Sequence, residues 1–120
     1  MKNLLFILGF ITFPLLAGAQ TTTKLLDKPD TTKKVLIVEA SCGQCKFGLP
    51  GMGCSLAVRI DGQAYYVNGT NIDSHGDSHA KDGFCAAIRT AEVQGELINN
   101  EFSVSYFKLQ KKTIKKNPKK

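Results

Sequence analysis

The hydrophobic pattern after residue 34 predicts mostly strands. VLIVEA, at 35–40, is a β-branched apolar run with the length of a buried strand. The segment 54–69, CSLAVRIDGQAYYVNG, contains Asp61-Gly62, which is typical of a two-residue type I′ hairpin turn because both residues tolerate positive φ. The pairs expected across this turn, all on the core face, are Ile60–Gln63, Val58–Tyr65 and Leu56–Val67.

A helix and a second hairpin are expected after this. In HAKDGFCAAIRTA, at 79–91, apolar residues recur at helical spacing, which predicts a helix that begins at Ser78, or at Asp82 as its N-cap. The residues of this stripe are Ala80, Phe84, Ile88 and Ala91. VQGELINNEFSVSYFKL, at 93–109, predicts a hairpin that turns at Asn99-Asn100, with Phe102, Val104 and Tyr106 on one face.

This order of elements predicts a mainly β domain with one helix. Five strands with a helix between strands 3 and 4 match a small five-stranded OB-like barrel. An α+β sheet with the helix packed on one face is the alternative. We expect a single domain over residues 35–109.

The amino-terminal pattern predicts export. MKNLLFILGFITFPLLAGAQ has a lysine, an apolar run and small residues before Gln20, which is typical of a cleaved signal peptide at 1–19. The apolar run is shorter than a bilayer span needs, and Pro14 interrupts it. We therefore expect a protein of the periplasm or the extracellular space.

The positive charge is concentrated outside the expected domain. Residues 20–34, expected to be a polar linker, carry four lysines and two aspartates, and residues 108–120 carry seven lysines and no acid. Residues 35–107 hold four basic and eight acidic residues, a net charge of 4 − 8 = −4. This acidic body disfavours nucleic-acid binding. The basic tail, 110–120, is expected to be solvated or to contact an anionic envelope surface.

The four cysteines allow three kinds of chemistry. Cys42, Cys45, Cys54 and Cys85 form an even set, which in an exported domain of this size predicts disulfides, such as Cys45–Cys54 with Cys42–Cys85. Cys42-x2-Cys45 also has the spacing of a zinc knuckle. The strand followed by CGQC resembles a thioredoxin-type redox site, but a long helix and the βαβ context are not expected after it.

Acidic and histidine side chains add further candidate metal ligands. They alternate along one short segment: Asp73, His75, Asp77 and His79. Together with Cys42, Cys45 and Cys85 they could supply ligands for zinc or copper. The alternative is that these polar residues only cap the helix and brace the loop.

Several motifs together resemble a known family. CGQCKFGLPGMGC, LAVRIDGQAYYVNGTNID, HGDSHAKDGFCAAIR and VQGE resemble those of small exported bacterial proteins classed as a domain of unknown function, over Val38 to Leu109. The resemblance implies one autonomous exported domain and no established activity. DGQAYYV and VQGEL are also similar to segments of other small OB-like envelope domains.

The sequence favours a non-enzymatic exported binding or structural module that is stapled by disulfides and needs no cofactor. The first alternative is a periplasmic zinc- or copper-binding protein with Cys and His ligands. The second is an OB-type nucleic-acid binder, against which the acidic body argues.

Overall fold

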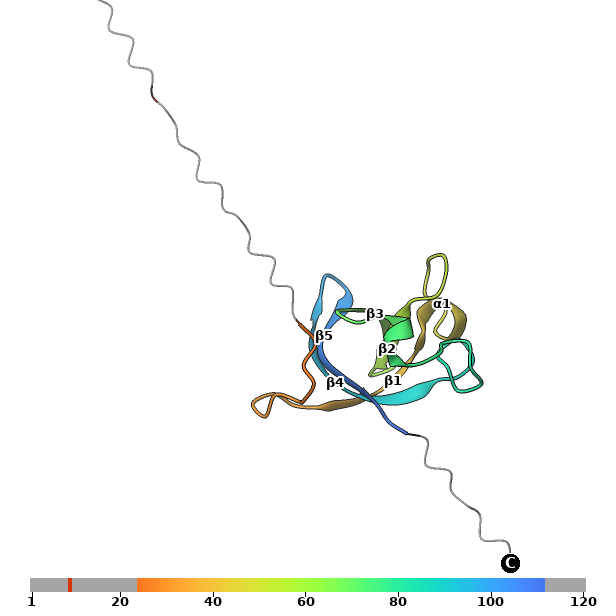
Figure 1. Cartoon of the computed structure of the whole chain (residues 1–120). Helices are drawn as coiled ribbons and strands as arrows, with labels where there is room; N and C mark the ends of the chain where they lie inside the picture. The colour runs from red at the N-terminus through yellow and green to blue at the C-terminus, as the bar shows by residue number, and fades with distance from the viewer. Residues whose placement is uncertain (1–8, 10–23, 112–120) are drawn as a thin grey trace, which may run out of the picture.

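A computed structural model describes residue 9 and residues 24–111. Between Leu36 and Leu109 the chain forms a small barrel of five strands (Figure 1). The expected signal peptide, 1–19, lies outside these residues apart from Gly9, and so does the basic tail apart from residues 110 and 111. The elements in chain order are β1 (Leu36–Cys42), α1 (Gly43–Lys46), β2 (Leu56–Ile60), β3 (Gln63–Asn68), η1 (Ile72–His75), β4 (Arg89–Ile98) and β5 (Glu101–Leu109). Within the described part of the chain, no helix has the length and apolar character needed to cross a bilayer.

The strands close in the order β1-β2-β3-β5-β4, and β4 pairs back with β1. All neighbours are antiparallel except β3 and β5, which run parallel. This arrangement confirms the expected mainly β class and the five-stranded OB-like barrel.

Both expected hairpin turns are present. Asp61 and Gly62 have φ of 49° and 82°, and Asn99 and Asn100 have φ of 50° and 63°, as a type I′ turn requires. The β2–β3 ladder contains the expected Ile60–Gln63 and Val58–Tyr65 pairs. It ends at Ala57–Tyr66 and does not reach the expected Leu56–Val67 pair. Val67 pairs with Phe102 of β5, on the other edge of β3.

A bulge changes which side chains of β5 face the core. Gln94 pairs with Tyr106 but Gly95 pairs with Val104, so Ser105 is an extra residue in β5. Phe102 and Val104 therefore face the core together with Phe107, whereas Tyr106 is buried outside the core cluster. The expectation that Tyr106 shares the face of Val104 was wrong, since alternation does not continue through a bulge.

The long helix expected from Ser78 or Asp82 to Ala91 is absent. η1 is one 3-10 turn at Ile72–His75, residues 77–88 form successive turns, and Ala91 lies in β4. Backbone groups that a helix would pair internally have partners elsewhere: Cys85 N–H donates to the Ser78 carbonyl, and the Phe84 carbonyl accepts from Cys42 N–H. Tertiary hydrogen bonds have therefore overridden the helical pattern.

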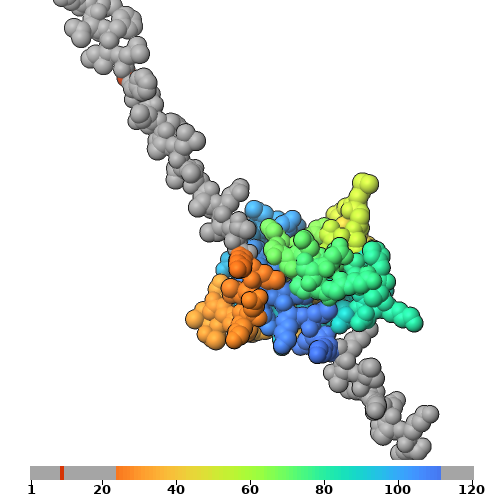
Figure 2. Space-filling model, viewed as in Figure 1, coloured from red at the N-terminus to blue at the C-terminus, as the bar shows by residue number. Residues whose placement is uncertain are grey.

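The polar segment before β1 contacts the barrel at two points. Leu26 N–H donates to the Ser105 carbonyl at 2.8 Å. The side chain of Gln94, which is 1 % exposed, accepts from Asp30 N–H and donates to the carbonyls of Asp30 and Lys33. In Figure 2 this segment (orange) lies directly against the body of the barrel.

Candidate functional site

The structure brings all four cysteines together at one end of β1. Cys42 ends β1, Cys45 lies in α1, Cys54 comes shortly before β2, and Cys85 lies between η1 and β4. Their Sγ atoms all lie within 4.8 Å of one another. Cys42 is buried, Cys54 and Cys85 are half-buried, and Cys45 is exposed. We call this set the cysteine cluster.

Backbone hydrogen bonds hold the three chain segments that meet at the cluster. Cys42 N–H donates to the Phe84 carbonyl at 3.0 Å, which fixes the segment of Cys85 beside the end of β1. Gly43 N–H donates to the Ser55 carbonyl at 2.8 Å, which does the same for the segment of Cys54. The cysteines are therefore positioned by main-chain contacts next to them and not only by their own side chains.

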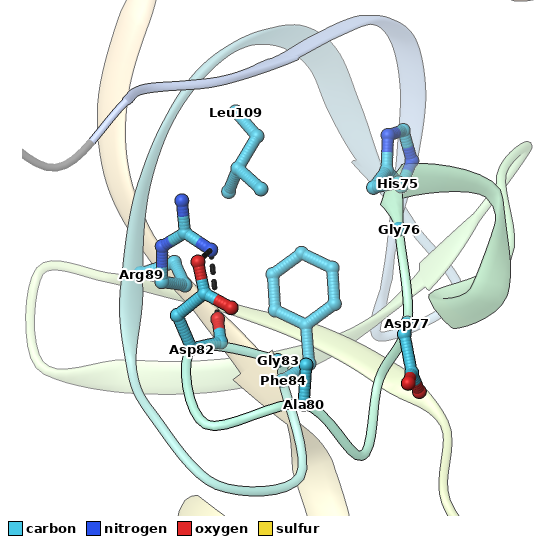
Figure 3. A pocket seen from close by; sticks show the side chains of 9 residues that line it. All are labelled: His75, Gly76, Asp77, Ala80, Asp82, Gly83, Phe84, Arg89 and Leu109. Atoms are coloured by element: carbon cyan, nitrogen blue, oxygen red, sulfur yellow. Dashed lines mark hydrogen bonds and ion pairs between the residues drawn. The ribbon is translucent and has the colours of Figure 1, made fainter.

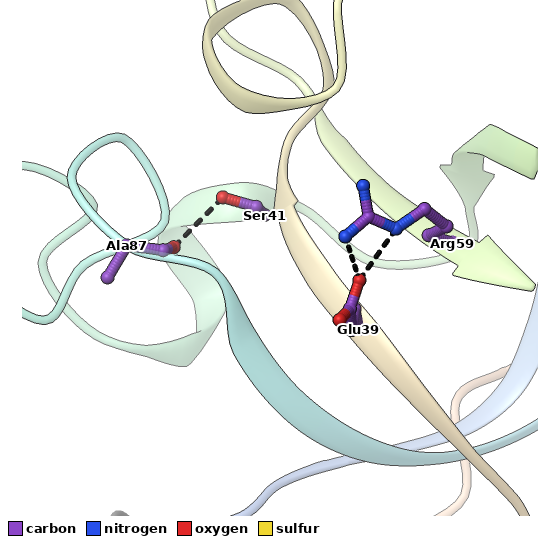
Figure 4. Close-up of polar contacts among 4 residues, drawn as sticks. All are labelled: Glu39, Ser41, Arg59 and Ala87. Atoms are coloured by element: carbon purple, nitrogen blue, oxygen red, sulfur yellow. Dashed lines mark hydrogen bonds and ion pairs between the residues drawn. The ribbon is translucent and has the colours of Figure 1, made fainter. Parts of the chain in front are cut away.

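The hydroxyl of Ser41 strengthens the contact with the segment of Cys85. Ser41 is fully buried, and its Oγ donates to the carbonyls of Phe84 at 2.7 Å and Ala87 at 2.9 Å. Figure 4 shows the Ser41–Ala87 contact on one side of β1 and, on the other, the guanidinium of Arg59 paired with the carboxylate of Glu39. Glu39 and Ser41 thus lie on the same face of β1 but contact different segments, Ser41 the turn-rich segment and Glu39 the strand β2.

The turn of α1 brings Cys42 and Cys45 together. Cys42 is the N-cap, and its Sγ accepts a hydrogen bond from Cys45 N–H at 3.4 Å. Gly43 between them is buried, and a Cβ there would lie 2.6 Å from Cε1 of Tyr66. The glycine of CGQC is therefore required by the close approach of α1 to β3.

Gln44 fixes the loop that connects Cys45 with Cys54, a role that the sequence did not indicate. Its Oε1 accepts from Ser55 N–H at 2.8 Å, and its Nε2 donates to Ser55 Oγ at 3.2 Å and to the Met52 carbonyl at 3.3 Å. The hydroxyl of Tyr66 also donates to the Pro50 carbonyl. The only feature of the sequence that hints at this role is the position of the glutamine within CGQC, and it is a weak indication.

The four thiols perturb one another electrostatically. Burial alone would raise the pKa of Cys42, but hydrogen bonds from the thiols of Cys54 and Cys45 and from backbone N–H groups lower it. The hydrogen bond with Cys42 raises the pKa of the exposed Cys45. Burial first, and the contacts with Cys42 and Cys85 next, raise the pKa of Cys54. The pKa values of Cys42 and Cys54 are thus displaced in opposite directions, and a bound divalent cation would favour the thiolate form of its cysteine ligands.

The distances suit two kinds of chemistry. In a tetrahedral zinc site with Zn–S bonds of about 2.3 Å, neighbouring sulfurs are about 3.8 Å apart, which lies inside the 4.8 Å limit of the cluster. Cys54 and Cys85 approach more closely, with 2.7 Å between their Sγ atoms. The cluster can thus bind a thiophilic metal or form disulfides. This close contact corresponds to neither of the expected pairs, Cys45–Cys54 and Cys42–Cys85.

The other candidate ligands are not brought to the cysteine cluster. His75 Nε2 contacts Thr70 Oγ1 at 2.9 Å, and its ring lies 4.4 Å from that of Phe107, centroid to centroid. Asp73 accepts from the hydroxyl of Ser78, and Asp77 accepts from His79 N–H. Within residues 24–111, the four cysteines are the metal-binding group that the geometry supports.

A small pocket lies on the other side of this turn-rich segment. It has a volume of about 230 Å³ and is lined by His75, Phe84, Arg89 and Leu109, among others (Figure 3). The guanidinium of Arg89 donates to the carbonyls of Asp82 and Gln110. Burial lowers the pKa of His75. Two of the guanidinium N–H donors of Arg89 are thus engaged by the chain itself.

Comparison with known proteins places the chain in a family. No curated protein and no solved structure matches it. Residues 36–110, which span all five strands and the four cysteines, match a family described as a family of unknown function, DUF6370. The chain belongs to this family of unknown function.

Proposed function

We propose that this protein is a small exported zinc-binding module, in which Cys42, Cys45, Cys54 and Cys85 hold one structural Zn²⁺. The observation that carries the proposal is the convergence of four sulfurs from three chain segments to within 4.8 Å of one another. Two disulfides need two close pairs, whereas a tetrahedral ion needs all four sulfurs around one point. The amino-terminal pattern supports export.

The ligand set favours zinc over copper(II). Four thiolates in a closed set are typical of structural zinc, whereas copper(II) prefers nitrogen and oxygen ligands in a tetragonal arrangement. Cys45 N–H, which donates to Cys42 Sγ, would stabilise a coordinated thiolate, as outer hydrogen bonds do in metal sites. The role is binding rather than catalysis, because a closed Cys₄ set leaves no position for a substrate.

Metal content and native mass of the purified protein test this proposal. The full chain, prepared under reducing conditions without chelator, is expected to contain one zinc per chain. Replacing all four cysteines with serine should abolish zinc binding. The matched control is the double variant His75→Gln with His79→Gln, which should retain one zinc because neither imidazole lies in the cluster. Absence of stoichiometric zinc from the reduced wild-type chain would refute the proposal.

A permanent Cys54–Cys85 disulfide is the second candidate, and the 2.7 Å approach of these two sulfurs favours it. Intact mass before and after reduction separates the two. A mass about 2 Da lower per disulfide in the native protein, with no bound metal, would support the staple and exclude the zinc site.

A further inference from the structure

We propose that the zinc site is opened by oxidation, through thiol–disulfide exchange that joins Cys54 to Cys85. This inference rests on the proposed function. Among the four cysteines, these two have Sγ atoms 2.7 Å apart and are both half-exposed. Cys42, by contrast, is buried and caps α1, where its sulfur accepts Cys45 N–H. The Cys54–Cys85 pair is therefore close enough to bond, and both of its sulfurs are more accessible than that of Cys42.

An incoming disulfide has a route to Cys54. Cys54 lines a groove of about 540 Å³. Hydroxyl, amide and carboxylate groups border this groove, and they come from Ser55, Thr70, Asn71, Asp73 and Ser74. Leu56, Val67 and Ile72 complete the lining, so the groove offers both polar and aliphatic contacts to a small, peptide-like aliphatic disulfide. Because Cys54 lines this groove and its sulfur lies 2.7 Å from that of Cys85, we expect Cys54 to react first through this route and Cys85 to resolve the mixed disulfide.

The reaction balances without any further reagent. Zinc keeps both sulfurs as thiolates. The thiolate of Cys54 attacks one sulfur of the incoming disulfide, which breaks its S–S bond and releases one thiolate. The thiolate of Cys85 then attacks the sulfur of Cys54 in the mixed disulfide, forms the Cys54–Cys85 bond and releases the second thiolate. The protein loses two electrons, the reagent gains two, and zinc leaves because two of its four donors are consumed.

The barrel keeps the pair together after the metal leaves. The hydrogen bonds from Cys42 N–H to Phe84, from Gly43 N–H to Ser55, and from Cys85 N–H to Ser78 involve no sulfur. They hold the segments of Cys54 and Cys85 against the end of β1 whether or not zinc is present. A reducing thiol can therefore restore the site without refolding.

Zinc release by glutathione disulfide tests the inference. Zinc-loaded full chain is mixed anaerobically with this disulfide, release is followed with a chromogenic chelator, and the first disulfide is identified by alkylation and peptide mass. We expect release at a rate proportional to the disulfide concentration, with Cys54–Cys85 as the first bond. Ser74→Trp, which fills the groove, should slow release at least several-fold. Thr31→Trp, in an exposed turn before β1, is the matched control and should not slow it.

The outcomes separate the two proposals. If the reduced chain binds no zinc, the proposed function and this inference both fail. If it binds zinc but keeps it in excess glutathione disulfide, or if Cys42–Cys45 forms first, only this inference fails. Equal release from the Ser74 and Thr31 variants would refute the route through the groove.

Discussion

Replacing Gly43 with alanine should destabilise the protein through a single contact. The new Cβ would lie 2.6 Å from Cε1 of Tyr66, which is 0.8 Å short of the 3.4 Å where ordinary contact begins. Ala57 and Leu49 each have an atom 3.1 Å from the same point, so α1 has no room to shift sideways. The ring of Tyr66 is itself held by its hydroxyl on the Pro50 carbonyl.

The expected magnitude follows from two opposing effects. Overpacking of this kind costs about 1–3 kcal/mol. Alanine returns about 0.4–1 kcal/mol by restricting the unfolded chain. We therefore expect the free energy of unfolding to fall by about 1–2 kcal/mol.

Urea unfolding followed by circular dichroism measures this loss in the zinc-loaded protein. Tyr66→Ala is the partner change in a double-mutant cycle, because it removes the ring that the methyl group would strike. Gly43→Ala should cost much less in that background than in the wild type. If the two changes are additive within about 0.5 kcal/mol, the contact with Tyr66 is not the reason that position 43 is glycine.

Three further outcomes are expected. Burial lowers the pKa of His75 in the folded protein below its ordinary 6.5, so the unfolded chain takes up the imidazole proton at a higher pH than the folded chain does. The free energy of unfolding should therefore have its full value above pH 6.5 and fall as the pH drops below 6.5. His75→Gln should flatten this slope in urea titrations at several pH values. Gln94→Met removes three hydrogen bonds to the segment of Asp30 and should cost about 1–3 kcal/mol in the same assay. Cys54→Ser should lower the midpoint of thermal unfolding relative to the wild type when zinc is present, but not when a chelator is in excess. An equal decrease under both conditions would contradict the metal site.

Local patterns in the sequence predicted the strands and both hairpins. Asp61-Gly62 and Asn99-Asn100 each combine residues that tolerate positive φ between alternating apolar runs, so turn chemistry and register agree. The bulge at Ser105 could not be predicted in this way, because either register keeps apolar residues in the core. The helix was predicted wrongly because Phe84 is fixed by contacts with residues more than forty positions away.

The candidate site was only partly predictable for a related reason. Cys-x2-Cys is a local signal, and it correctly indicated that Cys42 and Cys45 belong together. The approach of Cys54 and Cys85 to that pair depends on how the end of β1 and the start of β2 meet the turns after η1. The spacing of the cysteines along the chain does not specify this arrangement. His75 and Asp73 had an equally plausible spacing, but the fold directs them to Thr70 and Ser78.

The position of the cysteine cluster suggests what orders the connections of this barrel in place of the helix expected between strands 3 and 4. Residues 77–88 contain no regular element, and residues 46–53 contain three glycines, so both segments are costly to order. The first segment contains Cys85, and its Phe84 carbonyl accepts from Cys42 N–H. The second leads to Cys54, and its Phe47 and Leu49 N–H groups donate to the Gly43 carbonyl. One zinc would therefore order two segments at once, a role that packing of a helix would otherwise have to supply. Because Cys54 directly follows one of these segments and Cys85 lies in the other, oxidation of this pair would remove the metal while keeping the segments joined.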